Sequence, residues 1–294
     1  MKCLRNWMVS VFCGLVAIGC CFATEPVPEV RNYVLYYGPV DSDEAFRQLA
    51  EYDMIIIDPQ ALGAKAEEQI AGWKQQGRTV IGYLSCMEVA SWHRYLDRVD
   101  KTKILKLGGE PFQPFGDNLA MDLTDPAWQE LVVELMQSEV IDYGCDGVFM
   151  DTLADIEHPD LPEPLRQEQL RGLDELLGKI RHAYPELIMI SNWTVEKTLP
   201  VAAKYVDMIC WENCNPAFFA EDHPAVTFMR QVRDDFKREQ AKRPFRVLAL
   251  WAIPDGTERP EVQRRAMTEK ARELGYLNYS CYRDYHHGFL PLEQ

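Results

Sequence analysis

The chain has few of the residue patterns that mark metal, nucleotide or ester chemistry. Its six histidines form neither an HxH nor an HExxH pattern, and no two cysteines have CxxC spacing. Cys210 and Cys214 lack the companion histidines or cysteines of a zinc site, so we expect no metal and no cofactor. The GxSxG elbow of an esterase and the P-loop are also missing. Zinc hydrolases, serine esterases and phosphoryl-transfer enzymes are therefore poorly supported.

Basic residues are scarce as well. The sequence has 31 Lys and Arg against 46 Asp and Glu, which gives a formal net charge of -15. Removal of an N-terminal leader that carries Lys2 and Arg5 would bring the net charge to about -17. Such a surface repels nucleic acid and anionic membranes. It suits a neutral or cationic substrate, although an acidic surface also serves solubility alone.

The first residues have the layout of a secretory signal peptide. Lys2 and Arg5 precede an uncharged apolar run over residues 7–22, and small and polar residues follow it. A transmembrane anchor is the alternative, but the run is short for crossing a bilayer. No other segment is comparably apolar, so we expect no stable membrane span.

A small-residue cleavage site follows the apolar run. We predict cleavage after Ala23, with a signal peptide at residues 1–23 and a secreted or periplasmic domain at residues 24–294. Lipid attachment at Cys20 is the alternative, because Ala17-Ile18-Gly19-Cys20 loosely resembles a lipoprotein box.

Eight short apolar runs alternate with amphipathic stretches through the mature chain. They are Tyr33 to Tyr37, Met54 to Ile57, Val80 to Leu84, Gly147 to Met150, Leu187 to Ile190, Asp207 to Trp211, Arg246 to Trp251, and Tyr276 to Cys281. Runs such as MIII and VFM are typical of strands covered on both faces. The alternation predicts a single-domain (β/α)8 TIM barrel, which we expect to be a monomer. An open doubly wound sheet would need a glycine-rich nucleotide loop after its first strand, and none is present.

Helix signals lie between these runs. Asp125-Pro126 supplies the N-cap and first-turn proline of a helix that we expect to continue through Ile141. Two longer segments, residues 85–120 and 152–164, interrupt the alternation. Because they follow the third and fourth predicted strands, we expect them near the carboxyl end of the barrel.

Reactive groups of a (β/α)8 barrel lie at the carboxyl ends of its strands. The polar residues that follow the predicted strands there are Tyr37, Asp58, Glu88, Asp151, Asn192, Glu212 and Arg283. A single Asp in such a position can equally be a helix N-cap. Four carboxylates on one rim instead favour a functional mouth, so we expect these seven side chains to form a substrate site.

Paired carboxylates suit the cleavage of glycosidic bonds. One carboxyl group donates a proton to the leaving oxygen, while the other stays ionised and meets the positive charge at the sugar carbon. Trp193 and Trp211 stand at or just beyond strand ends, where they could stack on sugar rings. The alternative is that they belong to the core, as strand tryptophans commonly do.

A series of motifs extends over almost the whole mature chain. They are Tyr36-Tyr37-Gly38, Ile57-Asp58-Pro59-Gln60, Gly82-Tyr83-Leu84-Ser85 with Glu88, Gly144-Cys145-Asp146-Gly147-Val148-Phe149-Met150-Asp151, and Ser191-Asn192-Trp193. In this order they resemble the motif series of glycoside hydrolase family 114, the endo-α-1,4-polygalactosaminidase family of (β/α)8 barrels.

The resemblance implies endo-acting hydrolysis of α-1,4-linked galactosamine polymers without a metal. It implies that Asp151 and Glu212 are the catalytic carboxylates. It also places four residues around the sugar subsite, namely Asp58, Tyr83, Glu88 and Asn192. One departure is Met87, since the family usually has glycine before this Glu, so we expect the loop after Ser85 to follow another path.

We expect Asp151 to be the nucleophile, because a short side chain at a strand end is rigidly held. Glu212 is then the acid/base, and we expect the reaction to retain the anomeric configuration. Two alternatives stay open. The chain could be a carbohydrate-binding barrel without catalysis, or a barrel glycosidase that acts on a different glycan, because subsites are built from loops.

Overall fold

The structure is a computed structural model, and it describes residues 29–254, 257–282, 285–286, 288–290 and 292. The predicted signal peptide, including Cys20, lies outside the described residues, as does Arg283. Within the described part of the chain, no helix is long and apolar enough to cross a membrane.

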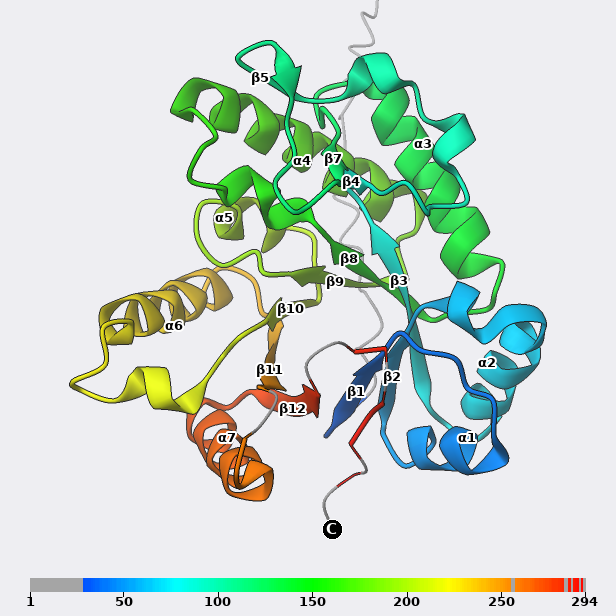
Figure 1. Cartoon of the computed structure of the whole chain (residues 1–294), viewed down its shortest axis with the longest axis vertical. Helices are drawn as coiled ribbons and strands as arrows, with labels where there is room; N and C mark the ends of the chain where they lie inside the picture. The colour runs from blue at the N-terminus through cyan, green and yellow to red at the C-terminus, as the bar shows by residue number, and fades with distance from the viewer. Residues whose placement is uncertain (1–28, 255–256, 283–284, 287, 291, 293–294) are drawn as a thin grey trace, which may run out of the picture.

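Eight parallel strands form a barrel at the centre of the molecule (Figure 1). They pair in chain order, and the last strand lies beside the first. The strands are β1 (Tyr33–Tyr36), β2 (Met54–Ile57), β3 (Thr79–Ser85), β8 (Gly147–Asp151), β9 (Ile188–Asn192), β10 (Met208–Trp211), β11 (Arg246–Ile253) and β12 (Leu277–Tyr282). The predicted (β/α)8 barrel is confirmed. The first and last residues of each predicted strand lie within two positions of those observed.

The barrel strands are buried on both faces. Ile55 and Ile56 of β2 are fully buried although they point to opposite sides of the sheet, and so are Val80 and Ile81 of β3. One face packs in the barrel interior and the other packs against the helices. This double burial explains the near-continuous apolar runs in the sequence.

Seven helices surround the barrel in the described chain (Figure 1). They are α1 (Asp43–Leu49), α2 (Ala66–Gln75), α3 (Pro126–Met136), α4 (Glu163–Ala183), α5 (Leu199–Ala202), α6 (Val226–Gln240) and α7 (Pro260–Leu274). The Asp125 side chain caps α3 as predicted, because it accepts hydrogen bonds from Ala127 N and Trp128 N. The α-helix ends at Met136, and residues 137–141 form a π-helical turn instead of the expected last turn.

The long segment after β3 forms two small antiparallel pairs. In one pair β4 (Glu88–Val89) lies beside β7 (Leu119–Ala120), and in the other β5 (Lys106–Leu107) lies beside β6 (Glu110–Pro111). Cys86 N donates to Asp151 O at 3.1 Å, which ties the start of this segment to the end of β8. A second excursion contains the short 3-10 helix Leu153–Glu157. Both predicted interruptions of the barrel therefore lie beside the carboxyl end of β8.

Candidate active site

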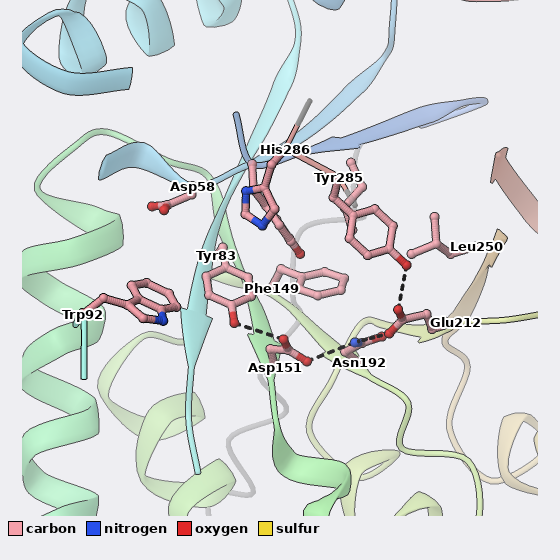
Figure 2. A pocket seen from close by; sticks show the side chains of 12 residues that line it. Asp58, Tyr83, Trp92, Phe149, Asp151, Asn192, Glu212, Leu250, Tyr285 and His286 are labelled. Carbon is pink, nitrogen blue, oxygen red and sulfur yellow. Dashed lines mark hydrogen bonds between the residues drawn. The ribbon is translucent and has the colours of Figure 1, made fainter. Parts of the chain in front are cut away.

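A cavity of about 240 Å³ opens at the carboxyl ends of the barrel strands. Its walls combine carboxylates with aromatic rings (Figure 2). The lining residues are Leu35, Tyr37, Asp58, Tyr83, Trp92, Phe149, Asp151, Asn192, Glu212, Leu250, Tyr285 and His286. Six of the ten site residues predicted from sequence are among them. These are Tyr37, Asp58, Tyr83, Asp151, Asn192 and Glu212.

The alternation of side chains along each strand places these groups. Leu35 and Tyr37 both line the cavity from the end of β1, and Phe149 and Asp151 do so from β8. In each pair the residues stand two apart, so they point to the same face of the strand. The apolar member forms the floor, and the polar member at the strand end reaches the mouth.

Asp151 accepts three hydrogen bonds, one from each neighbouring strand and one from the residue that follows it. Its Oδ2 accepts from Tyr83 Oη at 3.0 Å. Its Oδ1 accepts from Asn192 Nδ2 at 3.0 Å and from Thr152 N at 2.8 Å. Three donors around one carboxylate hold its orientation.

Asn192 connects Asp151 to Glu212. The Asn192 side chain is only 7% exposed, and its Nδ2 also donates to Glu212 Oε2 at 2.9 Å. Tyr285 Oη donates to the other oxygen, Glu212 Oε1, at 2.6 Å. Burial, and then the charge of Glu212, raise the pKa of Tyr285, so its hydroxyl keeps the proton that it donates. Figure 2 shows a continuous chain from Tyr83 through both carboxylates to Tyr285.

The bridging amide limits the distance between the two carboxylates. One nitrogen, Asn192 Nδ2, lies 3.0 Å from Asp151 Oδ1 and 2.9 Å from Glu212 Oε2. These two oxygens therefore lie no more than about 6 Å apart, so the two carboxylates lie close together in the cavity. The amide must present its nitrogen here, because its oxygen would face two acceptors.

Asp58 has both a structural and a cavity-facing position. Its Oδ1 accepts from Gln60 N at 2.9 Å and caps the 3-10 helix Pro59–Lys65, which is the N-cap alternative considered for strand-end acids. The side chain also lines the cavity. Burial raises the pKa of Asp58, while the Gln60 N–H acts in the opposite direction. Asp58 is thus a third carboxyl group at the mouth, on the side away from Glu212 (Figure 2).

Left-handed backbone occurs at the rim of the barrel. Among the described residues, four that are not glycine have positive φ: Thr152 (68°), Trp193 (50°), Asn213 (57°) and Tyr285 (54°). The first three come directly after Asp151, Asn192 and Glu212, the three residues of the central hydrogen-bonded chain. The backbone thus turns sharply at the point where each strand has presented its polar side chain. Strained backbone of this kind is concentrated at functional sites.

Three predicted substrate contacts do not lie at the cavity. Glu88 is 4% exposed and does not line the cavity, and Asn118 Nδ2 of the same loop donates to its Oε2, so its contact with substrate stays a prediction. Trp211 is 0% exposed, because it points to the face of β10 opposite to Glu212 and packs on Phe219 and Phe236. Trp193 is half-buried and is not a lining residue. The prediction for Arg283 falls outside the described residues.

Sequence reasoning did not select several residues that line the cavity. Tyr285 and His286 follow the last strand by three and four positions, so a search for polar residues directly after each strand stops short of them. Trp92 lies in the long segment after the third predicted strand, and no sequence motif marks it. Only its position in space identifies it. Leu35, Phe149 and Leu250 are strand residues whose apolar character predicts only the core.

Glu88 and Asp155 form a buried pair of carboxyl groups behind Asp151. Asn118 Nδ2 donates to Glu88 Oε2 at 2.7 Å, and the buried carboxyl group of Asp155 interacts with that of Glu88. Burial raises the pKa of both groups, and the charge of Glu88 helps to raise that of Asp155 to about 10. The raised pKa means that Asp155 keeps its proton at neutral pH, and a neutral Asp155 can donate to Glu88.

This pair should make stability depend on pH. Folding raises the pKa of Asp155 from 3.8 to about 10, so the stability linked to its proton is complete at low pH and is lost as pH rises towards 10. Asp155→Asn keeps a donor for Glu88 without a proton to lose. We expect its melting temperature to exceed that of the wild type by about 4 °C or more at pH 9, and by much less at pH 5. Calorimetry across this range, with the exposed Asp160→Asn as control, checks this, and parallel curves for wild type and variant would contradict it.

The described residues include no group of three or more His, Cys, Asp or Glu side chains that could hold a metal ion. That the protein needs no metal or cofactor stays a prediction from the sequence. The groups that can act on a substrate within the described cavity are the carboxyl groups, the tyrosine hydroxyls and the His286 imidazole.

A (β/α)8 barrel that holds two carboxylates close together across its mouth has the general plan of a glycoside hydrolase. Residues 24–231 match the model of glycoside-hydrolase family GH114, and the chain belongs to this family. The family drawn from the motif series in the sequence is thereby confirmed, and the protein is a glycoside hydrolase.

Solved structures share the fold at low sequence identity. The glycoside hydrolase domain of PelA from Pseudomonas aeruginosa has a TM-score of 0.70 and 17% identity, covering 89% of this chain and 98% of that one. Ega3 from Aspergillus fumigatus, in complex with galactosamine, has a TM-score of 0.65 and 14% identity, covering 91% and 96%. An α-galactosidase from Thermus thermophilus has a TM-score of 0.53 and 12% identity, covering 85% and 58%. No curated protein sequence matches the chain significantly.

Proposed function

We propose that the protein is an exported, endo-acting glycosidase that cleaves α-1,4-linked galactosamine in a polysaccharide. The observation that carries this proposal is the Asp151–Asn192–Glu212 chain at the mouth of a GH114 barrel. One buried amide fixes two carboxylates at a short separation, which is the arrangement that a retaining glycosidase needs. Export rests on the signal-peptide pattern of residues 1–23.

The charge of the cavity favours an amino sugar. Asp58, Asp151 and Glu212 line it, and none of the described lining residues is Lys or Arg. A cationic ammonium group on the sugar would lower the electrostatic repulsion among these acids, whereas an acidic sugar would raise it. Ega3, which shares the fold, was solved with galactosamine bound. Unacetylated galactosamine units are therefore the preferred substrate in this proposal.

The proposed reaction has two displacement steps. The Asp151 carboxylate attacks the anomeric carbon, while Glu212 gives its proton to the glycosidic oxygen as the C–O bond breaks. Glu212 then removes a proton from water, the water oxygen bonds to the anomeric carbon, and the Asp151 carboxylate leaves. Tyr285 and Asn192 hold Glu212 in place through both steps. Net retention of configuration follows from two inversions.

The test uses purified protein and defined polymers. We expect soluble oligosaccharides of several lengths, seen by mass spectrometry, from deacetylated α-1,4-galactosamine polymer. Fully acetylated polymer should react more slowly, because it lacks the ammonium groups. Cleavage of neutral glycans alone would overturn the substrate assignment. Binding without release of reducing ends would favour a carbohydrate-binding barrel, and release of single sugars only would contradict the endo mode.

Trp92 should contribute a sugar-binding surface at one end of the cavity. Its side chain is 69% exposed although it lines the site, and it lies across Asp151 from Glu212 (Figure 2). The ring packs edge-on against His93 with centroids 4.2 Å apart, which braces it. An exposed aromatic face beside a polysaccharide cleft is suited to stacking on a sugar ring.

We expect Trp92→Ala to raise KM about 3- to 10-fold, because a stacked ring contributes about 1 kcal/mol. kcat should change less than about 2-fold, since the indole is remote from the reacting bond. Phe115→Ala is the matched control: Phe115 is 64% exposed in the same long segment but does not line the cavity. Initial rates over a range of polymer concentrations measure both constants. Equal KM values for the two variants would remove Trp92 from the substrate site.

A further inference from the structure

Thr152 has the most unusual backbone conformation at the rim. Its φ is 68° and its ψ is -2°, in the left-handed region. Asn213 tolerates this region, but a β-branched residue such as threonine is a genuine outlier there. Such strain persists only where the surroundings enforce it. The contacts of Thr152 must therefore hold its backbone in this conformation.

The Thr152 hydroxyl is the centre of a compact hydrogen-bond network. Its Oγ1 accepts from Met87 N at 2.9 Å and from Glu88 N at 3.1 Å. The single hydroxyl hydrogen goes to Asp151 O, 2.7 Å away. Ser85 Oγ donates to Glu88 O at 2.8 Å and closes the same turn. One side chain thus joins the end of β8 to the turn that follows β3.

These contacts fix the peptide group between Asp151 and Thr152 at both ends. Its carbonyl oxygen accepts from Thr152 Oγ1 and from Cys86 N. Its N–H donates at 2.8 Å to Asp151 Oδ1, an oxygen of the carboxylate that faces the cavity. A donor held from both sides can orient the carboxylate, whereas a freely rotating peptide could not.

We infer that Thr152 is a positioning residue, whose hydroxyl locks the left-handed turn and so aims the Asp151 carboxylate at the substrate. The inference rests on the proposed function. A nucleophile must be held within a fraction of an ångström of its productive position. If only the Tyr83 and Asn192 side chains held the Asp151 carboxylate, it would move with them. The hydrogen bond from Thr152 N–H instead fixes the carboxylate to the backbone.

The buried carboxyl pair supports the same turn from behind. Glu88 supplies one of the two N–H donors to Thr152 Oγ1, and its own side chain is held by Asn118 and Asp155. Asp155 comes from the segment that follows Thr152. The Glu88–Asp155 pair is therefore a second link between the segment after β3 and the segment after β8. Glu88 acts in this arrangement through Thr152 and not by touching sugar.

Two variants separate the hydroxyl from the shape of the side chain. Thr152→Val keeps the volume but removes the acceptor for Met87 N and Glu88 N. We expect kcat to fall about 30- to 100-fold with KM within about 3-fold, because the nucleophile is misplaced while the binding surface is unchanged. Thr152→Ser keeps the hydroxyl and should stay within about 3-fold of wild-type kcat. Thr79→Val is the matched control, a buried threonine at the opposite end of β3.

Wild-type kcat in Thr152→Val, or an equal loss in Thr152→Ser, would overturn the inference. Crystal structures of both variants give a readout that does not depend on activity. In Thr152→Val we expect the hydrogen bond from residue 152 N to Asp151 Oδ1 to be lost, and in Thr152→Ser to be kept. An unchanged Asp151 carboxylate in the valine variant would refute positioning even if no substrate is found. A wild-type protein that cleaves no polymer would count against the proposed function alone.

Discussion

Asp151→Asn and Glu212→Gln should each lower kcat by about 1,000-fold or more on any polymer that the wild type cleaves. The expected loss is large because each residue takes part in bond making or proton transfer at the reacting centre. Both side chains are only partly buried at the cavity mouth, and neither belongs to the hydrophobic core. The melting temperature should therefore change little. Reducing-end release and calorimetry on the same preparations measure the two effects.

The control is Glu196→Gln, an exposed acid in the segment after β9 that does not line the cavity. Its activity should equal that of the wild type.

Azide should restore turnover to Asp151→Gly with formation of a glycosyl azide, because the small anion can occupy the place of a nucleophilic carboxylate. If Asp151→Asn or Glu212→Gln keeps near-normal activity, that residue is not catalytic. Asp58 is then the next candidate, since Glu88 is buried away from the cavity.

The barrel strands could be predicted well from the sequence, because strands that are buried on both faces consist almost entirely of apolar residues. Runs such as Met54–Ile57 admit no polar residue, so strand positions can be read within two residues. The π-helical turn after Met136 could not be read this way. The segment Gln137–Ile141 keeps helical composition, and the change of hydrogen-bond pattern depends on how it packs.

The site was predictable where a polar residue ends a strand on the inward face. Asp151 and Glu212 meet this condition, and the period of two also explains why Trp211, one position earlier than Glu212, points to the core. Glu88 does not line the cavity, because the chain leaves the barrel at Ser85 before reaching it. Tyr285 stands three positions beyond the end of β12, and no local sequence pattern predicts its hydrogen bond to Glu212.

Asn192 bridges the two carboxylates. It holds both acids through one nitrogen, and its short side chain is buried at the end of β9. Replacing it with aspartate keeps the shape but exchanges a donor for an acceptor. At neutral pH three carboxylates would then face one another within hydrogen-bonding distance, and their mutual repulsion would move Asp151 and Glu212 apart.

We expect Asn192→Asp to lose about 100- to 1,000-fold in kcat at pH 7, and to recover part of it in acid. The two neighbouring carboxylates raise the pKa of the introduced acid, so it gains a proton as pH falls and can again donate to one of them. The optimum of the kcat–pH profile should therefore shift to lower pH. Asn278→Asp makes the same exchange on β12, where the amide donates to Thr268 Oγ1 outside the cavity, and its profile should match that of the wild type. A kcat of Asn192→Asp that is lowered by the same factor at every pH would contradict this prediction. Misfolding alone would explain such a loss, and the positions of the carboxylates would then not depend on the Asn192 donor.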